Sequence, residues 1–303
     1  MASEKDFLFD PDYACKDFAH RHNILNTPMV QRETLAIYWT LRTKLEVDNE
    51  LKEHTEKLNQ TDPLCALLLS MLDRTFEYTE GSIAALVTGS TASSEVITRT
   101  VVESAINLLV VLVDDKNGSR LSQYFACYFD KEQEEIDKWI KLAANMKGEE
   151  SDVHRSSALG KRNAINQLKQ YTNTALSQIG LPTTEKLEKR WPDVAGRFHC
   201  LKLDIDYRTL YAALCSQTHS DADLLNYFVS VSLGNRDWSE KVSLETVNFS
   251  RFMVYFGVKY YLIAAEAYTI RFELSNAMEN MKSGRDIIAK QLENISTELR
   301  PRD

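Results

Sequence analysis

The sequence has little glycine and little proline. Only 10 of its 303 residues are glycine, and 6 are proline. Collagen-like and low-complexity chains need far more of both, so these classes are excluded. An all-β fold depends on many tight turns, which these two residues usually supply, so the composition also disfavours such a fold.

Cysteine is scarce and scattered. The five cysteines contain no Cys-x-x-Cys pair, and their number is odd. This pattern predicts reduced thiols in a cytoplasmic protein without a disulfide framework. The segment from His219 to Asp223 alternates metal-ligand types, but capping of a following helix by Asp221 explains it more simply. We therefore predict no metal and no cofactor.

Long hydrophobic runs are absent as well. The longest purely aliphatic run, 108–113, has six residues, whereas crossing a bilayer takes about 20. Residues 1–30 carry several charges and no apolar signal segment, which is unlike a secretory leader. The sequence thus predicts a cytoplasmic location and no membrane partner.

An excess of basic residues is also lacking. The chain has 44 acidic and 36 basic residues, for a formal net charge of −8. A phosphate-binding footprint needs clustered Lys and Arg, so broad nucleic-acid binding is disfavoured. A small basic groove, and with it a possible RNA partner, stays open.

What the sequence does contain is helical periodicity over nearly its whole length, with apolar residues at steps of three or four. We predict an all-α fold, a helical bundle with long C-terminal helices. Its parts are an N-terminal extension (1–30) and a single α-helical domain (31–300). The first predicted helix covers 28–59 and begins with Thr27 as its N-cap. A polar loop is predicted at 148–157. The other predicted helices cover 63–87, 95–113, 120–146, 161–179, a segment that begins at 206, and 221–228.

The C-terminal segment has a heptad-like apolar stripe from Phe249 to Leu299. Such a stripe either packs long helices on the body of one chain or forms the seam of a homodimer. Both alternatives stay open. On the second alternative, the stripe is a dimer seam and the protein is a homodimer. A single helix of this length would be longer than a compact domain of this size, so we expect either a break near Ser283-Gly284 or a protruding arm.

Polar residues form one stripe on the otherwise apolar helix 95–113. Arg99, Glu103 and Asn107 follow each other at steps of four, so Arg99 and Glu103 are close enough to pair. If the stripe faces solvent, it is the ordinary outer face of a helix. If it faces inward, its charges need partners, and a pocket becomes plausible.

A second candidate set lies between Tyr207 and His219. Tyr207 and Tyr211 share one face of a helix, and Ser216 lies one turn before His219. A hydroxyl beside an imidazole is the minimal pair for nucleophilic catalysis. The alternative is that His219 ends the helix and interacts with its last carbonyls. We predict that Glu103 and His219 meet in a pocket bordered by Tyr207 or Tyr211.

These segments resemble a bacterial helical family of unknown function, the one numbered fifty-six seventy-seven among such domains. The matching residues are Arg99 to Glu103, the aromatic helix with Tyr124 and Tyr128, and Tyr207, Tyr211, Ser216 and His219. The resemblance spans roughly residues 65–270. It implies an all-helical cytoplasmic protein without an assigned reaction.

That family is similar in style to the HEPN helical proteins, many of which are metal-independent RNases of toxin and phage-defence systems. Their signature has four to six residues between an Arg and a His on one helix, whereas ten residues separate Arg208 from His219 here. Two functions follow. The first is a bundle that binds a protein partner or assembles with itself, and its polar residues are structural. The second is an RNase-like hydrolase in which His219 is the general base, Arg99 stabilises the developing phosphate charge and Glu103 orients one of the two.

Overall fold

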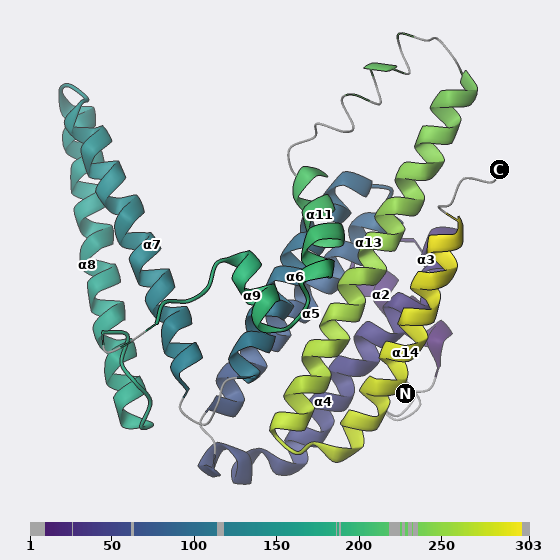
Figure 1. Ribbon diagram of the computed structural model, residues 1–303, viewed down its shortest axis with the longest axis horizontal. Helices are drawn as coiled ribbons and strands as arrows, with labels where there is room; N and C mark the ends of the chain where they lie inside the picture. Colours follow the sequence, from purple (N-terminus) through teal and green to yellow (C-terminus); the bar gives the residue numbers. More distant parts are fainter. Residues whose placement is uncertain are drawn as a thin grey trace. The chain divides into compact units, whose positions relative to one another are not determined.

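The computed structural model describes residues 10–25, 27–61, 64–113, 118–185, 187, 189–217, 225, 228–229, 232 and 236–298. Contacts divide the chain into two compact units (Figure 1), unit 1 with residues 1–112 and 197–303 and unit 2 with 113–196. The described residues form helices and loops, which confirms the all-α prediction. The single domain at 31–300 stays a prediction, because compactness does not measure cooperative folding.

Unit 1 is a bundle of long helices around α13. Within it, α13 packs against α4, α5, α6 and α14, and α5 packs against α6. Its helices are α2 (Pro11–Arg21), α3 (Pro28–Arg32), α4 (Thr34–Thr61), α5 (Leu64–Val87), α6 (Thr91–Leu112), α9 (Val194–Cys200, which begins in unit 2), α10 (Asp204–Asp206), the π-helical turn η1 (Tyr207–Tyr211), α11 (Ala212–Gln217), α13 (Arg236–Arg271) and α14 (Ser275–Glu298).

The core lies along α13 and the second half of α6. Between residues 253 and 268, α13 is buried on nearly every face, and Val101 to Leu112 of α6 are mostly buried. A helix that is apolar all round belongs in the interior. Gly257 permits close approach here, because a Cβ atom at this position would lie 2.9 Å from the Thr98 methyl group of α6.

The first predicted helix is interrupted. Thr27 makes no side-chain capping bond, and α3 ends after one turn at Glu33, which has φ −101° and ψ 19°. The buried Glu33 carboxylate binds Arg251 of α13. Before this point, α2 packs on α4 through four buried residues, so part of the predicted N-terminal extension is structured.

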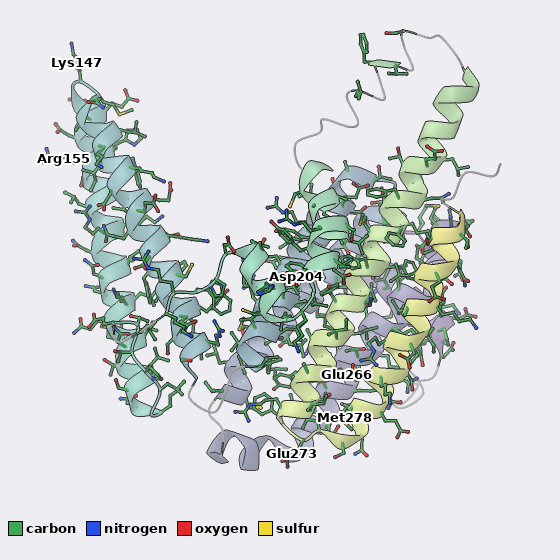
Figure 2. All side chains as sticks on the ribbon, viewed as in Figure 1. Lys147, Arg155, Asp204, Glu266, Glu273 and Met278 are labelled. Atoms are coloured by element: carbon green, nitrogen blue, oxygen red, sulfur yellow. The ribbon has the colours of Figure 1, made fainter. Side chains whose placement is uncertain are left out.

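The break in the C-terminal helices lies earlier than predicted. It falls between Arg271 and Ser275, not at Ser283-Gly284, because Glu273 takes a left-handed φ of 56° and the Leu274 N–H donates to the Thr269 carbonyl. Glutamate is an unusual residue for this helix-ending position, where glycine is expected. Figure 2 labels Glu273 in the turn between α13 and α14.

Unit 2 is a helical hairpin followed by a return segment. Its helices are α7 (Ser119–Ala144) and α8 (Glu149–Gln178), and they pack along a narrow core of Phe129, Ile136 and Ile165. The polar loop predicted at 148–157 is wrong, because α8 begins directly after Gly148. The acidic side chains of its first turn favour a helix N-terminus, which explains why a polar segment is helical.

One helix start differs from its predicted position. Helix α6 begins at Thr91, four residues before the predicted start, and Ser94 donates to the Thr91 carbonyl from inside the helix. Most of the predicted helix at 221–228 lies outside the described residues.

In the part of the chain that the structure describes, no helix combines the length and apolarity that a bilayer crossing requires.

Candidate functional site

The polar stripe of α6 lies at the surface of the unit 1 core, not in it. Arg99, Glu103 and Asn107 are each half-buried, and the helix positions between them are largely buried. Steps of four residues place the three side chains in one line. The line is met by α9 and by the turn η1, so its polar groups have partners from outside α6.

A continuous hydrogen-bond network joins these elements. The Arg99 Nε donates to the Tyr211 hydroxyl at 3.4 Å, and this hydroxyl donates to the Glu103 carboxylate at 3.1 Å. Arg197 of α9 donates to the other Glu103 oxygen at 3.2 Å and also to the Asn107 side-chain oxygen. Each oxygen of the Glu103 carboxylate therefore accepts one hydrogen bond, one from Tyr211 and the other from Arg197.

The Arg197 guanidinium is the most deeply placed charge of the network. Its side chain is 6% exposed, against 35% for Glu103. A buried cation is tolerated when it is paired and hydrogen-bonded, and both conditions hold here. Sequence reasoning missed Arg197. The only signal for it was indirect, because half-buried Glu103 and Asn107 require a donor from elsewhere in the chain.

Aromatic rings form a wall beside the network. Phe198 lies 5.5 Å from the ring of Tyr207 and 5.3 Å from that of Tyr211, and these two tyrosines stack at 5.7 Å. The Arg99 guanidinium lies 5.8 Å from the centre of the Tyr211 ring. The wall is anchored to α13, because Tyr260 donates to Asp206 at 2.6 Å.

Protonation states follow from burial. Burial raises the pKa of Tyr211 to about 12, so at neutral pH its hydroxyl keeps its proton and donates it to Glu103. The hydrogen bond to Tyr211 raises the pKa of Arg99, which stays a cation. Within the described network, the Glu103 carboxylate accepts from Tyr211 and Arg197.

The structure brings together Arg99, Glu103, Asn107 and Tyr211, with Tyr207 stacked on Tyr211. Helix α11 carries Ser216 at its end, but the Ser216 side chain and all of His219 lie outside the described residues. The predicted contact between Glu103 and His219 therefore stays a prediction. So do the catalytic and binding roles assigned to these residues.

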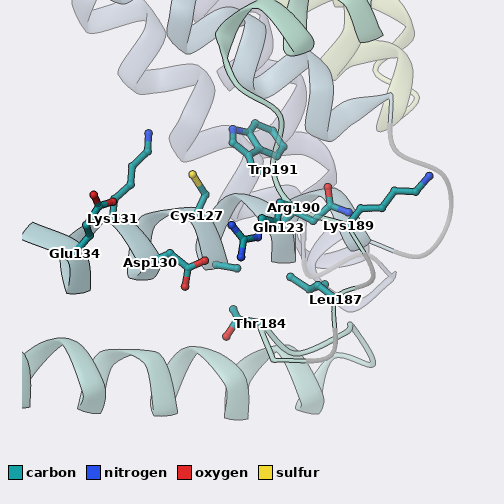
Figure 3. Close-up of a pocket in the computed structure, with 11 residues that line it drawn as sticks. Gln123, Cys127, Asp130, Lys131, Glu134, Thr184, Leu187, Lys189, Arg190 and Trp191 are labelled. Carbon is teal, nitrogen blue, oxygen red and sulfur yellow. The ribbon is translucent and has the colours of Figure 1, made fainter.

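Unit 2 contains a pocket that the sequence did not indicate. Its volume is about 300 Å³, and it lies between one face of α7 and the return segment after α8 (Figure 3). The α7 face contributes residues at helical spacing from Gln123 to Glu134, and the return segment contributes Thr184, Leu187, Lys189, Arg190 and Trp191. No sequence motif predicts this pocket, because one of its two walls is the irregular segment that follows α8.

Comparison with known proteins places the chain in one family. Residues 66–236 match the Family of unknown function (DUF5677), a range that contains α6, the hairpin, α9 and the turn η1. No curated protein matches, and no solved structure matches. The match covers more than half of the chain and confirms the resemblance found in the sequence. The chain belongs to the DUF5677 family of unknown function.

Proposed function

We propose that this protein is a self-assembling helical bundle, and that it pairs with a second copy through α8. The observation that carries the proposal is a row of seven uncharged side chains along α8, all exposed. We name them the α8 row: Val153, Ser157, Gly160, Ala164, Leu168, Tyr171 and Ala175. A helix in a monomer normally presents charged or polar residues on its outer face.

The α8 row is distinct from the face that builds the hairpin. Helix α8 packs on α7 through Ala158, Ile165 and Leu176, which are buried. The α8 row lies about 100° around the helix from these positions. Its largest members are strongly exposed, with Tyr171 at 71% and Val153 at 62%. Exposed apolar side chains in a continuous line favour an interaction surface.

The spacing of the α8 row supports a second copy of this chain as the partner. From Ala164 the row runs in steps of four, three and four residues in both directions. An antiparallel pair of α8 helices with Ala164 on the two-fold axis would therefore keep register over the whole row. It would set small side chains opposite large ones, namely Gly160 with Leu168, Ser157 with Tyr171, and Ala175 with Val153.

Charge supports the same partner. A chain of net charge −8 repels its own copies, so self-association costs least through a face without charge. The α8 row contains no charged residue, and Ser156, Asn163, Gln167 and Thr174 flank one edge of it. At the other edge, Lys161 is already neutralised by Glu132 of α7 at 2.7 Å.

Most of the C-terminal stripe packs within its own chain. Phe256, Tyr260, Met281, Ile288 and Ile295 are buried within unit 1, and among its described members only Ile270 and Met278 are exposed. Among the described residues of the stripe, this favours the first of the two alternatives, packing of the C-terminal helices on their own chain. We therefore assign the predicted homodimer to α8 instead.

The test is the Leu168→Glu variant in sedimentation equilibrium. Each dimer would bury two charges in an apolar contact and lose two leucines, each of which contributes about 1.5–3 kcal/mol. We expect a dimer for the wild type and a dissociation constant raised by about 100-fold or more for the variant. The matched control is Leu159→Glu, since Leu159 lies on the same helix outside the α8 row and is 42% exposed, against 46% for Leu168.

Two results would contradict the proposal. One is a wild-type chain that stays monomeric at high micromolar concentration. The other is an equal loss of dimer in both variants, because the effect would then come from added charge and not from the α8 row.

An RNase-like hydrolase is the second candidate. What supports it is the convergence of Arg99, Glu103 and Tyr211, with a cationic guanidinium beside an aromatic wall. It requires a general base, the role assigned to His219 on the sequence. The network as described is satisfied without a base, so we place assembly first.

A further inference from the structure

The pocket of unit 2 has two walls of different character. The α7 wall carries Asp130, Lys131 and Glu134, and the facing wall carries Lys189, Arg190 and Trp191. Figure 3 shows the side chains of both walls. The volume of about 300 Å³ is at the lower end of the range for small-molecule sites, roughly 300–1,000 Å³.

The walls are held in place by contacts outside the cavity. Ser122 of α7 donates to the Pro182 carbonyl at 2.6 Å, which ties the return segment to the helix. The Thr184 N–H and hydroxyl both donate to the Asn173 side chain of α8, at 2.9 and 2.8 Å. The Trp191 ring packs edge-on against Tyr124 at 5.3 Å. A site fixed before binding saves the entropy of ordering its walls.

The charge of the pocket departs from that of the chain. Lys131, Lys189 and Arg190 are three cations, and Asp130 and Glu134 are two carboxylates, so the lining has a net charge of +1 in a chain of net −8. Glu134 is already bound to Lys138 at 3.0 Å. Among the described residues, no carboxylate lies within ion-pair distance of the three cations. A lining with an excess of cations that have no carboxylate partner among the described residues favours an anionic ligand.

The pocket also offers a flat aromatic surface. The Trp191 indole follows Lys189 and Arg190 directly in the chain, and all three line the cavity. Arginine recognises a phosphate group through its planar guanidinium, lysine adds a point charge, and an indole stacks on a planar heterocycle. The two carboxylates, Asp130 and Glu134, are acceptors for hydroxyl or amino groups.

From this geometry we infer that the pocket binds a nucleoside monophosphate. The phosphate binds Arg190, the Lys131 and Lys189 side chains add positive charge on either side of it (Figure 3), and the base lies against Trp191. Asp130 accepts hydrogen bonds from the ribose hydroxyls or from an exocyclic amino group. The volume fits one such molecule and leaves no room for a strand of RNA, which needs an extended groove. The inference is independent of the proposed assembly, because no member of the α8 row lines the pocket.

The experiment is calorimetric titration of the full chain with AMP, GMP, CMP and UMP, with inorganic phosphate and the free nucleosides as separate probes. We expect at least one monophosphate to bind about tenfold or more tightly than phosphate and than its own nucleoside. The variant Lys189→Ala/Arg190→Ala should weaken that binding by about tenfold or more, and Trp191→Leu by a similar factor, because it removes the ring on which the base stacks.

Three controls show whether a loss of binding comes from the pocket itself or from misfolding, from the removal of any surface cation, or from failed assembly. Lys189 and Arg190 are exposed, so their replacement should leave the circular dichroism spectrum unchanged. Lys147→Ala removes an exposed cation at the tip of the hairpin (Figure 2) and should leave binding unchanged. Leu168→Glu should also bind normally, so a failed assembly test and a failed binding test are distinguishable.

Three outcomes would overturn the inference. The first is no binding of any monophosphate. The second is equal binding of inorganic phosphate, which would make this an anion site without base recognition. The third is binding of an RNA strand, or of a monophosphate, that survives Lys189→Ala/Arg190→Ala.

Discussion

Replacing Arg251 by methionine is expected to lower the free energy of unfolding by about 3–5 kcal/mol, because it leaves a buried carboxylate without its cation. The Arg251 Nε lies 2.9 Å from one Glu33 oxygen and 3.0 Å from the other. The two side chains are 7% and 1% exposed, so water cannot replace the lost partner. Arg32 approaches Glu33 only to 3.8 Å and is 37% exposed, so it compensates little.

The matched control is the double variant Glu33→Leu/Arg251→Met. Replacing both members of a buried ion pair by apolar side chains of similar size is often neutral or stabilising. Urea unfolding of the wild type, the single variant and the double variant measures the difference. A single variant that loses less than about 1 kcal/mol, or a double variant no better than the single one, would show that the pair is not the link between α13 and the junction of α3 and α4.

The second large effect is expected at Gly284. A Cβ atom there would lie 2.5 Å from Cε3 and 2.9 Å from two further ring atoms of Trp39. The Trp39 ring is 5% exposed, and the Arg42 guanidinium lies 4.9 Å from its centre, so the ring has little room to move. We expect Gly284→Ala to destabilise unit 1 by about 2–3 kcal/mol, although alanine is the better helix former by about 1 kcal/mol.

Gly81→Ala is the control for this substitution. Gly81 lies within α5, and its Cβ would meet only the Ile97 side chain, at 3.8 Å, an ordinary contact distance. Helix propensity then dominates, and the variant should be neutral or stabilised by up to about 1 kcal/mol. Thermal melts of both variants test the pair. Equal stabilisation of the two would mean that α14 does not pack against Trp39 as closely as described.

The periodicity of apolar residues made the fold class predictable, but it did not predict where individual helices end. The apolar spacing of α5, α7 and α13 follows directly from the sequence, because burial on one face imposes it. The break at Glu273 could not be found in this way, since the chain takes a left-handed conformation there without the glycine that usually marks one. Gly284 led to the wrong position for the break, because a glycine often ends a helix but this one lies within α14. It is required by the close approach of Trp39 and not by a turn.

The candidate network shows a similar limit. The i, i+4 spacing of Arg99, Glu103 and Asn107 was visible in the sequence, as was the pair Tyr207 and Tyr211. The placement of Arg197 beside Glu103 depends on how α9 packs on α6, ninety-four residues away in the chain. Packing between distant helices is not encoded in any local pattern, so neither Arg197 nor the unit 2 pocket could be predicted.

The most direct test of assembly through α8 is disulfide cross-linking of the Ala164→Cys variant, in a chain whose exposed Cys200 is replaced by serine. Only a residue on the two-fold axis meets its own copy, and a disulfide requires Cα atoms about 4.4–6.8 Å apart. We expect mild oxidation to convert most of this variant to a covalent dimer and to leave Leu159→Cys, in the same background, mostly monomeric. Equal cross-linking at the two positions, or none at Ala164→Cys, would contradict the account.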